Sequence, residues 1–412
     1  MYLVEQHIIS VNDKRYKDLD RICFLSKNLY NAALYTIKQE FLSTGKWIRA
    51  GELNKKMVTE NNIDYRAMSG SSSQQVLMAL DKNLKSYFSA IKSWKRDNKK
   101  FTGCPKFPRY KHKTKGRNVF SYSYAQFKHK GNFIFFPKKE GLSPLKTNCK
   151  EGSVKQIRFV PKSDCYVIEV IYESFVKEQL PDNNRIMSID LGVNNLASIV
   201  TNTNNKPVLI DGRKLKSINR YYNKKRSKIQ QQLKKVNGKE NSRRLMSLTR
   251  KRNNKVRDYL HKASKEIINT CLEDNITTLI VGYNDGWKQE SNLGKRNNQN
   301  FVSIPFDMFI SMLRYKSERQ GLRFVEVNES HTSKCSSFDL ESVEHHDTYV
   351  GKRIKRGLFR TKDGILLNAD VNGSYNIMRK VKGDAVMPPY TGFGYNPVKK
   401  FINKYVSTQA DI

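Results

Sequence analysis

Two aspartates stand where a carboxylate is expected to serve chemistry as well as structure. Asp190 ends the apolar stretch RIMSIDLG, in which Ile189 and Leu191 are expected to be buried. A carboxylate among buried apolar residues costs several kcal/mol unless it is hydrogen-bonded or bound to a cation. Asp370, in NADVNG, begins a helical stretch. Hard divalent cations prefer oxygen ligands, and a pair of them can stabilise the attacking and leaving oxygens of phosphodiester hydrolysis.

Each aspartate also has a purely structural interpretation. Asp190 could accept hydrogen bonds in the turn GVNN that follows it, and Asp370 could cap the first turn of its helix. The pair nevertheless favours a shared site, because strand ends and a helix start can converge on one edge of a sheet. Two acids can hold one ion, and a third is usually needed to fix a pair of ions.

The third acid is expected at the end of the apolar stretch TTLIVGYND, where Gly282 stands instead. Three acids follow as candidates: Asp285 in the turn NDG, Glu290 farther along the same loop, and Glu329 at the end of LRFVEVNE. A glycine leaves space that a neighbouring group can occupy. We therefore predict that Glu329 projects its carboxylate across Gly282 toward Asp190. Glu326, on the same strand and expected on the same face, is the reserve candidate.

The charge of the chain predicts a polyanionic partner. Lysine and arginine number 76 against 38 aspartate and glutamate residues, a net charge of +38. Residues 214–257 alone hold seventeen basic residues and the single acid Glu240. A solvated helix face normally mixes signs, so this segment is expected to lie along the phosphates of a nucleic acid. The residues that we predict to bind nucleic acid are Lys224, Lys225, Arg226, Arg250, Lys251 and Arg252.

Other classes of protein fit the sequence less well. No apolar run approaches the length of a membrane-spanning helix, so we expect no membrane partner. The six cysteines are scattered without any C-x-x-C pair, which indicates reduced thiols in a cytoplasm. We expect a bacterial cytoplasmic protein that associates with the nucleoid when it is bound to DNA.

The elements around the acids form an α/β multidomain pattern. Residues 2–11 predict a strand, 13–100 predict helices with a basic face, and 101–183 predict short strands with basic and aromatic residues. After residue 184 the order is three strands, helices, strand, helix, strand, insert and helix, which is the order of the RNase H-like fold. The expected domains are a small β-barrel of residues 1–12 and 101–183, a helical bundle of 13–100 inserted into it, an RNase H-like domain of 184–330 and 365–383, an insert of 331–364, and an irregular tail of 384–412.

A family resemblance rests on four segments taken together. In this order and spacing, IDLGVNNLASIV, LIVGYNDGWKQ, ESHTSKC and LLNADVNGSYNIMRK resemble the TnpB proteins of bacterial insertion sequences, ancestors of the type V CRISPR effectors. The likeness covers most of the chain, including GCPKFPRYK. It implies an RNA-guided DNA endonuclease with a RuvC-like domain. Such a protein would bind a guide RNA from the transposon end and cut double-stranded DNA beside a short motif. Asp190, Glu329 and Asp370 would be catalytic and bind two Mg²⁺ ions.

The chain departs from the family pattern at two places. The family strand that matches TTLIVGYND ends in a glutamate where this chain has Gly282, although some relatives have moved this acid. In the insert, relatives carry two cysteine pairs that bind zinc, whereas this chain keeps Cys335 and replaces its partner by Phe338. We expect the zinc to be lost, since His331, His345 and His346 fit no usual zinc spacing. Two alternatives stay open: a nuclease-dead RNA-guided repressor of the same fold, and a transposase or recombinase that acts without RNA.

Overall fold

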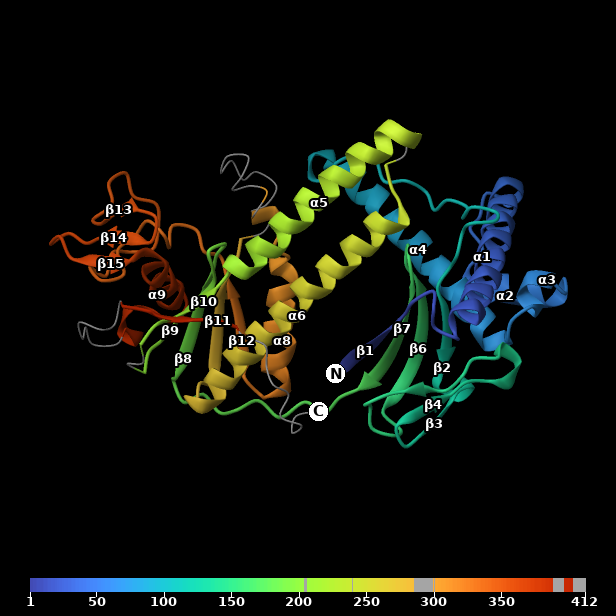
Figure 1. Ribbon diagram of the computed structural model, residues 1–412, viewed down its shortest axis with the longest axis horizontal. Coiled ribbons are helices and arrows are strands. Elements are labelled where there is room, and N and C mark those ends of the chain that lie inside the picture. Colours follow the sequence, from blue (N-terminus) through green and yellow to red (C-terminus); the bar gives the residue numbers. More distant parts are fainter. Residues whose placement is uncertain (204–205, 239, 285–298, 300, 388–395, 403–412) are drawn as a thin grey trace. The chain divides into compact units, whose positions relative to one another are not determined.

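The computed structural model describes residues 1–203, 206–238, 240–284, 299, 301–387 and 396–402, which fall into two compact units (Figure 1). Unit 1 spans Met1–Ser174, and unit 2 begins at Phe175. The sequence predicts this boundary near residue 183. The difference arises because the backbone after Phe175 belongs to unit 2, where the Leu180 N–H donates to the Gly321 carbonyl at 2.8 Å.

Unit 1 contains an antiparallel sheet with strand order β1-β7-β6-β2. Its strands are β1 (Tyr2–Ile9), β2 (Phe120–Ser123), β6 (Val154–Pro161) and β7 (Tyr166–Glu173). A second antiparallel sheet contains β3 (Lys128–Lys130), β4 (Phe133–Phe135) and β5 (Leu145–Lys146). The sequence predicts a small barrel here. In the described residues the pairing instead leaves β1 and β2 as the two edges of an open sheet.

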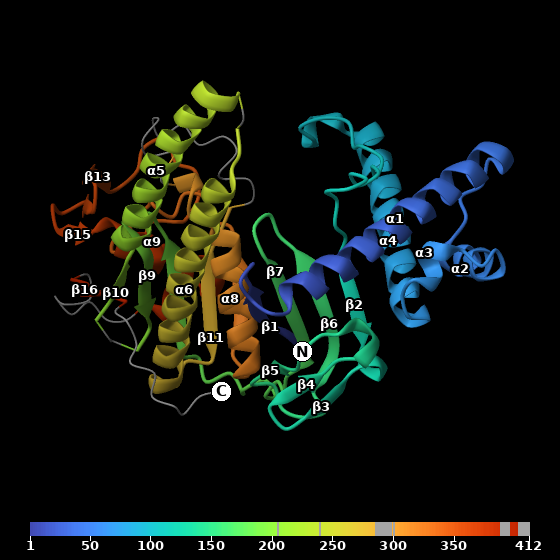
Figure 2. The ribbon, with the colours of Figure 1, turned by 45° about the vertical axis from the view of Figure 1, so that its right-hand side comes forward.

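The helices of unit 1 confirm the helical region that the sequence predicts between residues 13 and 100. They are α1 (Tyr16–Thr44), α2 (Ala50–Thr59), α3 (Ile63–Arg66) and α4 (Gly70–Arg96). The long helix α1 ends at Gly45, whose φ of 70° is the left-handed conformation that favours glycine. Figure 2 shows α1 and α4 beside the strands β2 and β6, and all four elements contribute to one apolar core.

Unit 2 is built on a six-stranded mixed sheet with the order β12-β11-β8-β9-β10-β16. The strands are β8 (Ile186–Leu191), β9 (Asn195–Thr201), β10 (Val208–Asp211), β11 (Thr278–Gly282), β12 (Arg323–Val327) and β16 (Val398–Lys400). Antiparallel pairing joins β8, β9 and β10, which confirms the predicted run of three consecutive strands and its first hairpin. The later strand β11 pairs in parallel with both β8 and β12.

Helices cover both faces of this sheet. They are α5 (Arg213–Asn237), α6 (Arg243–Glu273), α8 (Phe306–Arg319) and α9 (Ala369–Lys382). Met187 and Ile189 of β8 share a core with α6 and α8, whereas Ile186 shares a separate core with α9. Figure 1 shows the same arrangement, with α9 on one side of the sheet and α6 and α8 on the other. Alternate residues of each strand therefore face different helices.

The insert and the tail complete unit 2. The insert carries a small antiparallel sheet of β13 (Lys352–Lys355), β14 (Leu358–Arg360) and β15 (Leu366–Asn368). The sequence predicts an irregular tail from residue 384. The structure instead places β16 within it, paired in parallel with β10 at the sheet edge. No helix in the described part of the chain is long and apolar enough to cross a bilayer.

Candidate functional site

The pleat of the sheet brings the predicted acids to the face that α9 covers. On β8, Asp190 follows Ile186 and Ser188 in the two-residue period, and the Ser188 hydroxyl donates to the Ser374 carbonyl of α9 at 2.7 Å. On β12, Val325 and Val327 pack against the α9 core. Because side chains alternate along a strand, those that continue this face at the carboxyl ends of β8, β11 and β12 point toward the start of α9.

Asp190 lies directly under α9. A Cβ added to Gly373 of α9 would come within 2.8 Å of the Asp190 Oδ2. The glycine thus gives the carboxylate room between the strand and the helix. The alternative role of Asp190 as a cap for the following turn receives no support, because the turn is closed by a backbone hydrogen bond from Gly192 N–H to the Leu196 carbonyl.

The space beside Gly282 is taken up first by the Ile377 side chain of α9, and the Glu329 carboxylate borders it. Gly282 pairs with Val327 in the parallel ladder of β11 and β12, and Glu329 follows two residues later. A Cβ added to Gly282 would come within 3.2 Å of the Glu329 Oε2. Asn284 fixes the glutamate from both ends, because its Nδ2 donates to the carboxylate at 3.3 Å and its Oδ1 accepts from the Glu329 N–H at 3.2 Å.

Asp370 does not cap its own helix. Asn368 takes that role, since its Oδ1 accepts from the N–H groups of Asp370 and Val371 at 3.0 and 3.2 Å. The Asp370 carboxylate instead accepts from Asn195 Nδ2 at 2.7 Å and from Arg353 at 3.4 Å. The capping interpretation of Asp370 is therefore wrong, and its carboxylate is left to face β9 and the insert.

The three acids are close enough for the charges of Glu329 and Asp370 to act on Asp190. Burial, followed by the charges of Glu329 and Asp370, holds the pKa of Asp190 well above its usual range, although Arg353 acts in the opposite direction. Burial also raises the pKa of Glu329 to about 7. The Glu329 Oε2 is buried, and no described residue forms a hydrogen bond with it. Like charges and an unsatisfied oxygen are features that a bound cation would stabilise.

The donor set fits a hard divalent cation in its chemistry, since all three side chains offer carboxylate oxygens. The described residues contain no group of three or more histidine, cysteine, aspartate or glutamate side chains close enough to hold one ion together. Asp370 is at present paired with Arg353. In this arrangement, the charges of Glu329 and Asp370 act on Asp190, and Asp370 also forms a salt bridge with Arg353.

Sequence reasoning did not find Arg353, Asn195 and Asn284, which contact the acids. Arg353 belongs to β13 of the insert, and the other two follow β8 and β11 in the chain. The asparagines stand next to the family segments, in GVNN and GYND, and could have been singled out as carboxylate partners. Arg353 lies in a basic run with no distinguishing spacing, so only the fold identifies it.

Of the other candidate acids, the structure describes only Glu326, and it lies away from the site. Glu326 was expected on the same face as Glu329, and this is wrong. The two residues are three positions apart, so the pleat turns Glu326 to the opposite face, where it forms an ion pair with Arg314 of α8. Asp285 and Glu290 lie outside the described residues.

The basic helices α5 and α6 present most, but not all, of the predicted nucleic-acid residues to solvent. Lys224, Lys225, Arg226 and Lys251 are exposed. Arg250 is partly buried and has an interaction partner. Arg252 is also partly buried, and its guanidinium donates to Asn219 Oδ1 at 2.8 Å and to the Ser303 carbonyl at 2.6 Å. Arg252 thus stabilises the helix packing, and its predicted contact with nucleic acid stays a prediction.

An amide side chain of α9 forms hydrogen bonds with the insert, and a carboxylate of the insert accepts two of the insert's own backbone N–H groups. Asn372 donates to the Cys335 carbonyl at 2.8 Å and accepts from the Ser337 N–H at 2.9 Å. Glu341 is buried, and its two oxygens accept from the N–H groups of Ser336 and Val350 at 2.7 and 2.8 Å. The Asn372 hydrogen bonds join α9 to a distant part of the chain, whereas those of Glu341 close the local loop that precedes β13.

Two segments of the chain match known families. Residues 165–288 match OrfB_IS605, described as a probable transposase, and residues 306–377 match the Cas12f1-like TNB domain. The first segment contains Asp190 and Gly282, and the second contains Glu329 and Asp370.

Curated relatives and a solved structure extend these matches. A TnpB-like protein of Methanocaldococcus jannaschii is 33% identical over 195 residues, which are 45% of this chain and 66% of the relative. A TnpB-like protein of Acidianus two-tailed virus is 26% identical over 215 residues, 50% of this chain but only 44% of that relative. The structure of Cas12f1 with sgRNA and target DNA has a TM-score of 0.52 at 13% identity, covering 88% of this chain and 81% of that one. This likeness concerns the fold and confirms the predicted α/β multidomain architecture.

Proposed function

This chain is related to the TnpB-like proteins, and we propose that it is an RNA-guided DNA endonuclease. It would bind a guide RNA from the end of an insertion sequence and cut target DNA beside a short motif. The strand order of unit 2 supports an RNase H-like, RuvC-type nuclease domain. Asp190, Glu329 and Asp370 would hold two Mg²⁺ ions, which supply a nucleophile of lowered pKa and stabilise the leaving oxygen.

The observation that carries the proposal is the Glu329 carboxylate above Gly282. Its Oε2 is buried without a hydrogen-bond partner among the described residues and would lie 3.2 Å from a Cβ at position 282. A buried, unsatisfied carboxylate oxygen costs about 1–3 kcal/mol or more.

The chain's own residues prepare the site in two ways. Asn195 and Asn284 hold the carboxylates of Asp370 and Glu329 by hydrogen bonds, which fixes their orientation. Arg353 brings a guanidinium to Asp370, and this group also suits the oxygens of a phosphodiester. The exposed lysines and arginines of α5 and α6 would hold a guide–target duplex through its phosphates.

DNA cleavage by the full chain with its copurifying RNA and Mg²⁺ tests the proposal. Wild type should cut a target that matches the RNA. Glu329→Gln should slow cutting by at least about a hundredfold, since a metal site supplies several kcal/mol of transition-state stabilisation. Glu326→Gln is the matched control, because it changes an acid on the same strand but on the opposite face. Full activity in Glu329→Gln would remove Glu329 from the site.

A second candidate is an RNA-guided repressor of the same fold that has lost cutting. The absence, among the described residues, of three acids close enough to share one ion favours it. This candidate predicts tight guided DNA binding with no nicking at any Mg²⁺ concentration. Binding and nicking measured on the same target therefore separate the two functions.

A further inference from the structure

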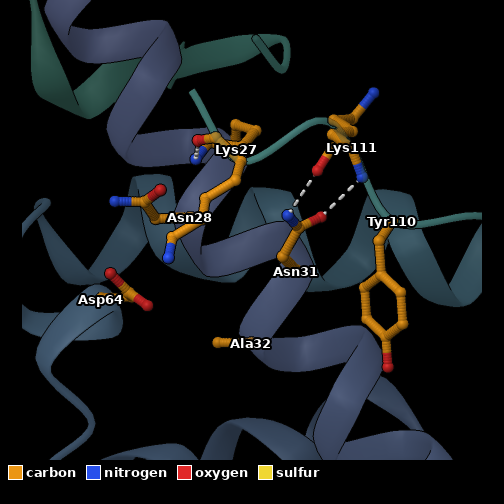
Figure 3. A pocket seen from close by; sticks show the side chains of 8 residues that line it. Lys27, Asn28, Asn31, Ala32, Asp64, Tyr110 and Lys111 are labelled. Carbon is orange, nitrogen blue, oxygen red and sulfur yellow. Dashed lines mark hydrogen bonds between the residues drawn. The ribbon is translucent and has the colours of Figure 1, made fainter. Parts of the chain in front are cut away.

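We propose that a cavity in unit 1 binds an unpaired guanine nucleotide of a nucleic-acid strand. The inference rests on the proposed nucleic-acid function but concerns a site remote in sequence from the acids. The cavity has a volume of about 590 Å³, within the usual range for a small-molecule site. Side chains of α1, Asp64 of α3 and the segment 110–113 line it (Figure 3).

One wall of the cavity is held in place by α1. Asn31 forms two hydrogen bonds with the backbone of Lys111, donating to its carbonyl and accepting from its N–H, both at 2.9 Å. The Lys27 ammonium donates to the Lys113 carbonyl at 2.6 Å. Figure 3 shows these dashed contacts at the upper side of the cavity. A segment without regular secondary structure is thereby given one conformation before any ligand arrives.

Two polar side chains in the cavity take part in no hydrogen bond within the described part of the chain, although the charge of Asp64 acts on the nearby Lys27 ammonium. The described residues provide no hydrogen-bond partner for the Asp64 carboxylate or the Asn28 amide. Asp64 is not needed as a helix cap, because Asn62 caps α3 by accepting from the Tyr65 N–H at 3.1 Å. Both side chains are partly buried, where unpaired polar groups are costly. Their retention indicates a polar ligand.

The types of these groups select one base. A carboxylate accepts hydrogen bonds only, and guanine alone among the common bases presents two adjacent donors, N1–H and N2–H₂. Adenine and cytosine place a ring acceptor beside their amino group, and uracil and thymine place one N–H between two carbonyls. Asp64 can therefore pair with guanine through both carboxylate oxygens. The Asn28 amide offers a donor for the remaining guanine acceptors.

An aromatic ring and a lysine suit the rest of a nucleotide. Tyr110 lines the cavity with 46% of its surface exposed, and Figure 3 shows it and Asp64 on either side of the small residue Ala32. Unpaired bases commonly stack on such rings. Lys113 lines the same wall and could neutralise a phosphate, whereas the Lys111 ammonium lies over the Tyr30 ring.

Binding of single-stranded heptamers tests the site. The probes are oligouridine with one central guanosine, adenosine or cytidine, all-uridine oligomer, and the same set in DNA, measured by fluorescence anisotropy with the full chain. Wild type should bind the guanine probe at least about fivefold more tightly than the other three, the smallest effect expected of one bidentate pair. A preference in the RNA set or in the DNA set identifies which strand supplies the base.

Variants decide whether the preference belongs to this cavity. Asp64→Asn should abolish it, because an amide replaces one acceptor by a donor. Glu60→Gln, a nearby exposed acid outside the cavity, should retain it. Asn28→Ala should reduce the preference for the guanine probe. It serves as the test variant if Asp64→Asn does not fold. Absence of preference in wild type, or a preference that survives Asp64→Asn, overturns the proposal. Asp190→Asn should keep the preference, so failure of the nuclease and failure of the cavity give different results.

Discussion

The sheet edge around Gly282 and the insert around Cys335 each lack a residue of the TnpB pattern, but their carboxylates are in opposite states. At the sheet edge, Glu329 borders the space over Gly282 beside Ile377, and its Oε2 has no hydrogen-bond partner among the described residues. In the insert, both oxygens of Glu341 accept backbone N–H groups.

This difference distinguishes the candidate cation site at Glu329 from the structural cross-link that Glu341 forms in the insert. A buried carboxylate oxygen without a donor favours the approach of a cation, whereas a carboxylate saturated by backbone donors is satisfied without one. The insert can therefore be held by hydrogen bonds alone. At the sheet edge, the proposed cation would supply the positive charge that the acids lack.

The largest expected effect concerns the sheet edge. Asp190→Asn should reduce guided DNA cleavage by at least about a hundredfold, because it removes one of the proposed metal-binding carboxylates. Single-turnover cleavage rates measure this. Asp258→Asn changes an exposed acid of α6 that pairs only locally with Lys262, and it should cut like wild type. Equal rates for the two variants would show that the sheet edge is not the cutting site.

Filling the space above Gly282 should also separate the two regions. Gly282→Ala adds a Cβ that overlaps the buried Ile377 side chain and meets Glu329. We expect a stability loss of about 1–3 kcal/mol, typical of an overpacked core, together with reduced cleavage. Thermal unfolding and cleavage rates measure these effects. Gly51→Ala, where the added Cβ meets open space, is the control and should be neutral or slightly stabilising.

The insert should depend on Glu341 and be indifferent to chelators. Glu341→Ala leaves two N–H groups without their acceptor, at a cost of about 1–3 kcal/mol each if they stay buried. Hydrogen exchange of residues 336–350 should accelerate in this variant, whereas the exposed Glu344→Ala should behave like wild type. Adding EDTA to wild type should leave this exchange unchanged. Faster exchange with EDTA would mean that a metal holds the insert.

The smallest expected effect is the pH dependence of Glu329 in the metal-free protein. Burial raises its pKa from 4.5 to about 7, so the folded state retains the proton more strongly than the unfolded state. Stability relative to Glu329→Gln should therefore fall by about 1–3 kcal/mol as the pH rises from 4.5 to 7. Thermal unfolding of both proteins without metal across this range measures the difference. A constant difference would place Glu329 in a solvated position.

The sequence was sufficient where a local pattern determines the structure. The two-residue period of β8 and the turn after Leu191 predicted the first hairpin. The order of the predicted strands and helices along the chain predicted the α/β architecture. Counting charges identified the exposed face of α5 and α6, but the same count could not tell Arg252, which bonds to Asn219, from the free lysines beside it.

Only the tertiary structure decided how separate segments meet. The sequence predicts Glu329 near Gly282, but the parallel register of β11 and β12 that sets their positions joins strands about forty residues apart and is encoded by no local pattern. The release of Asp370 by the Asn368 cap, and the approach of Arg353 from the insert, depend on the same long-range packing. The sequence determines the residue types of the acids. Their charges act on one another only because α9 covers one face of the sheet.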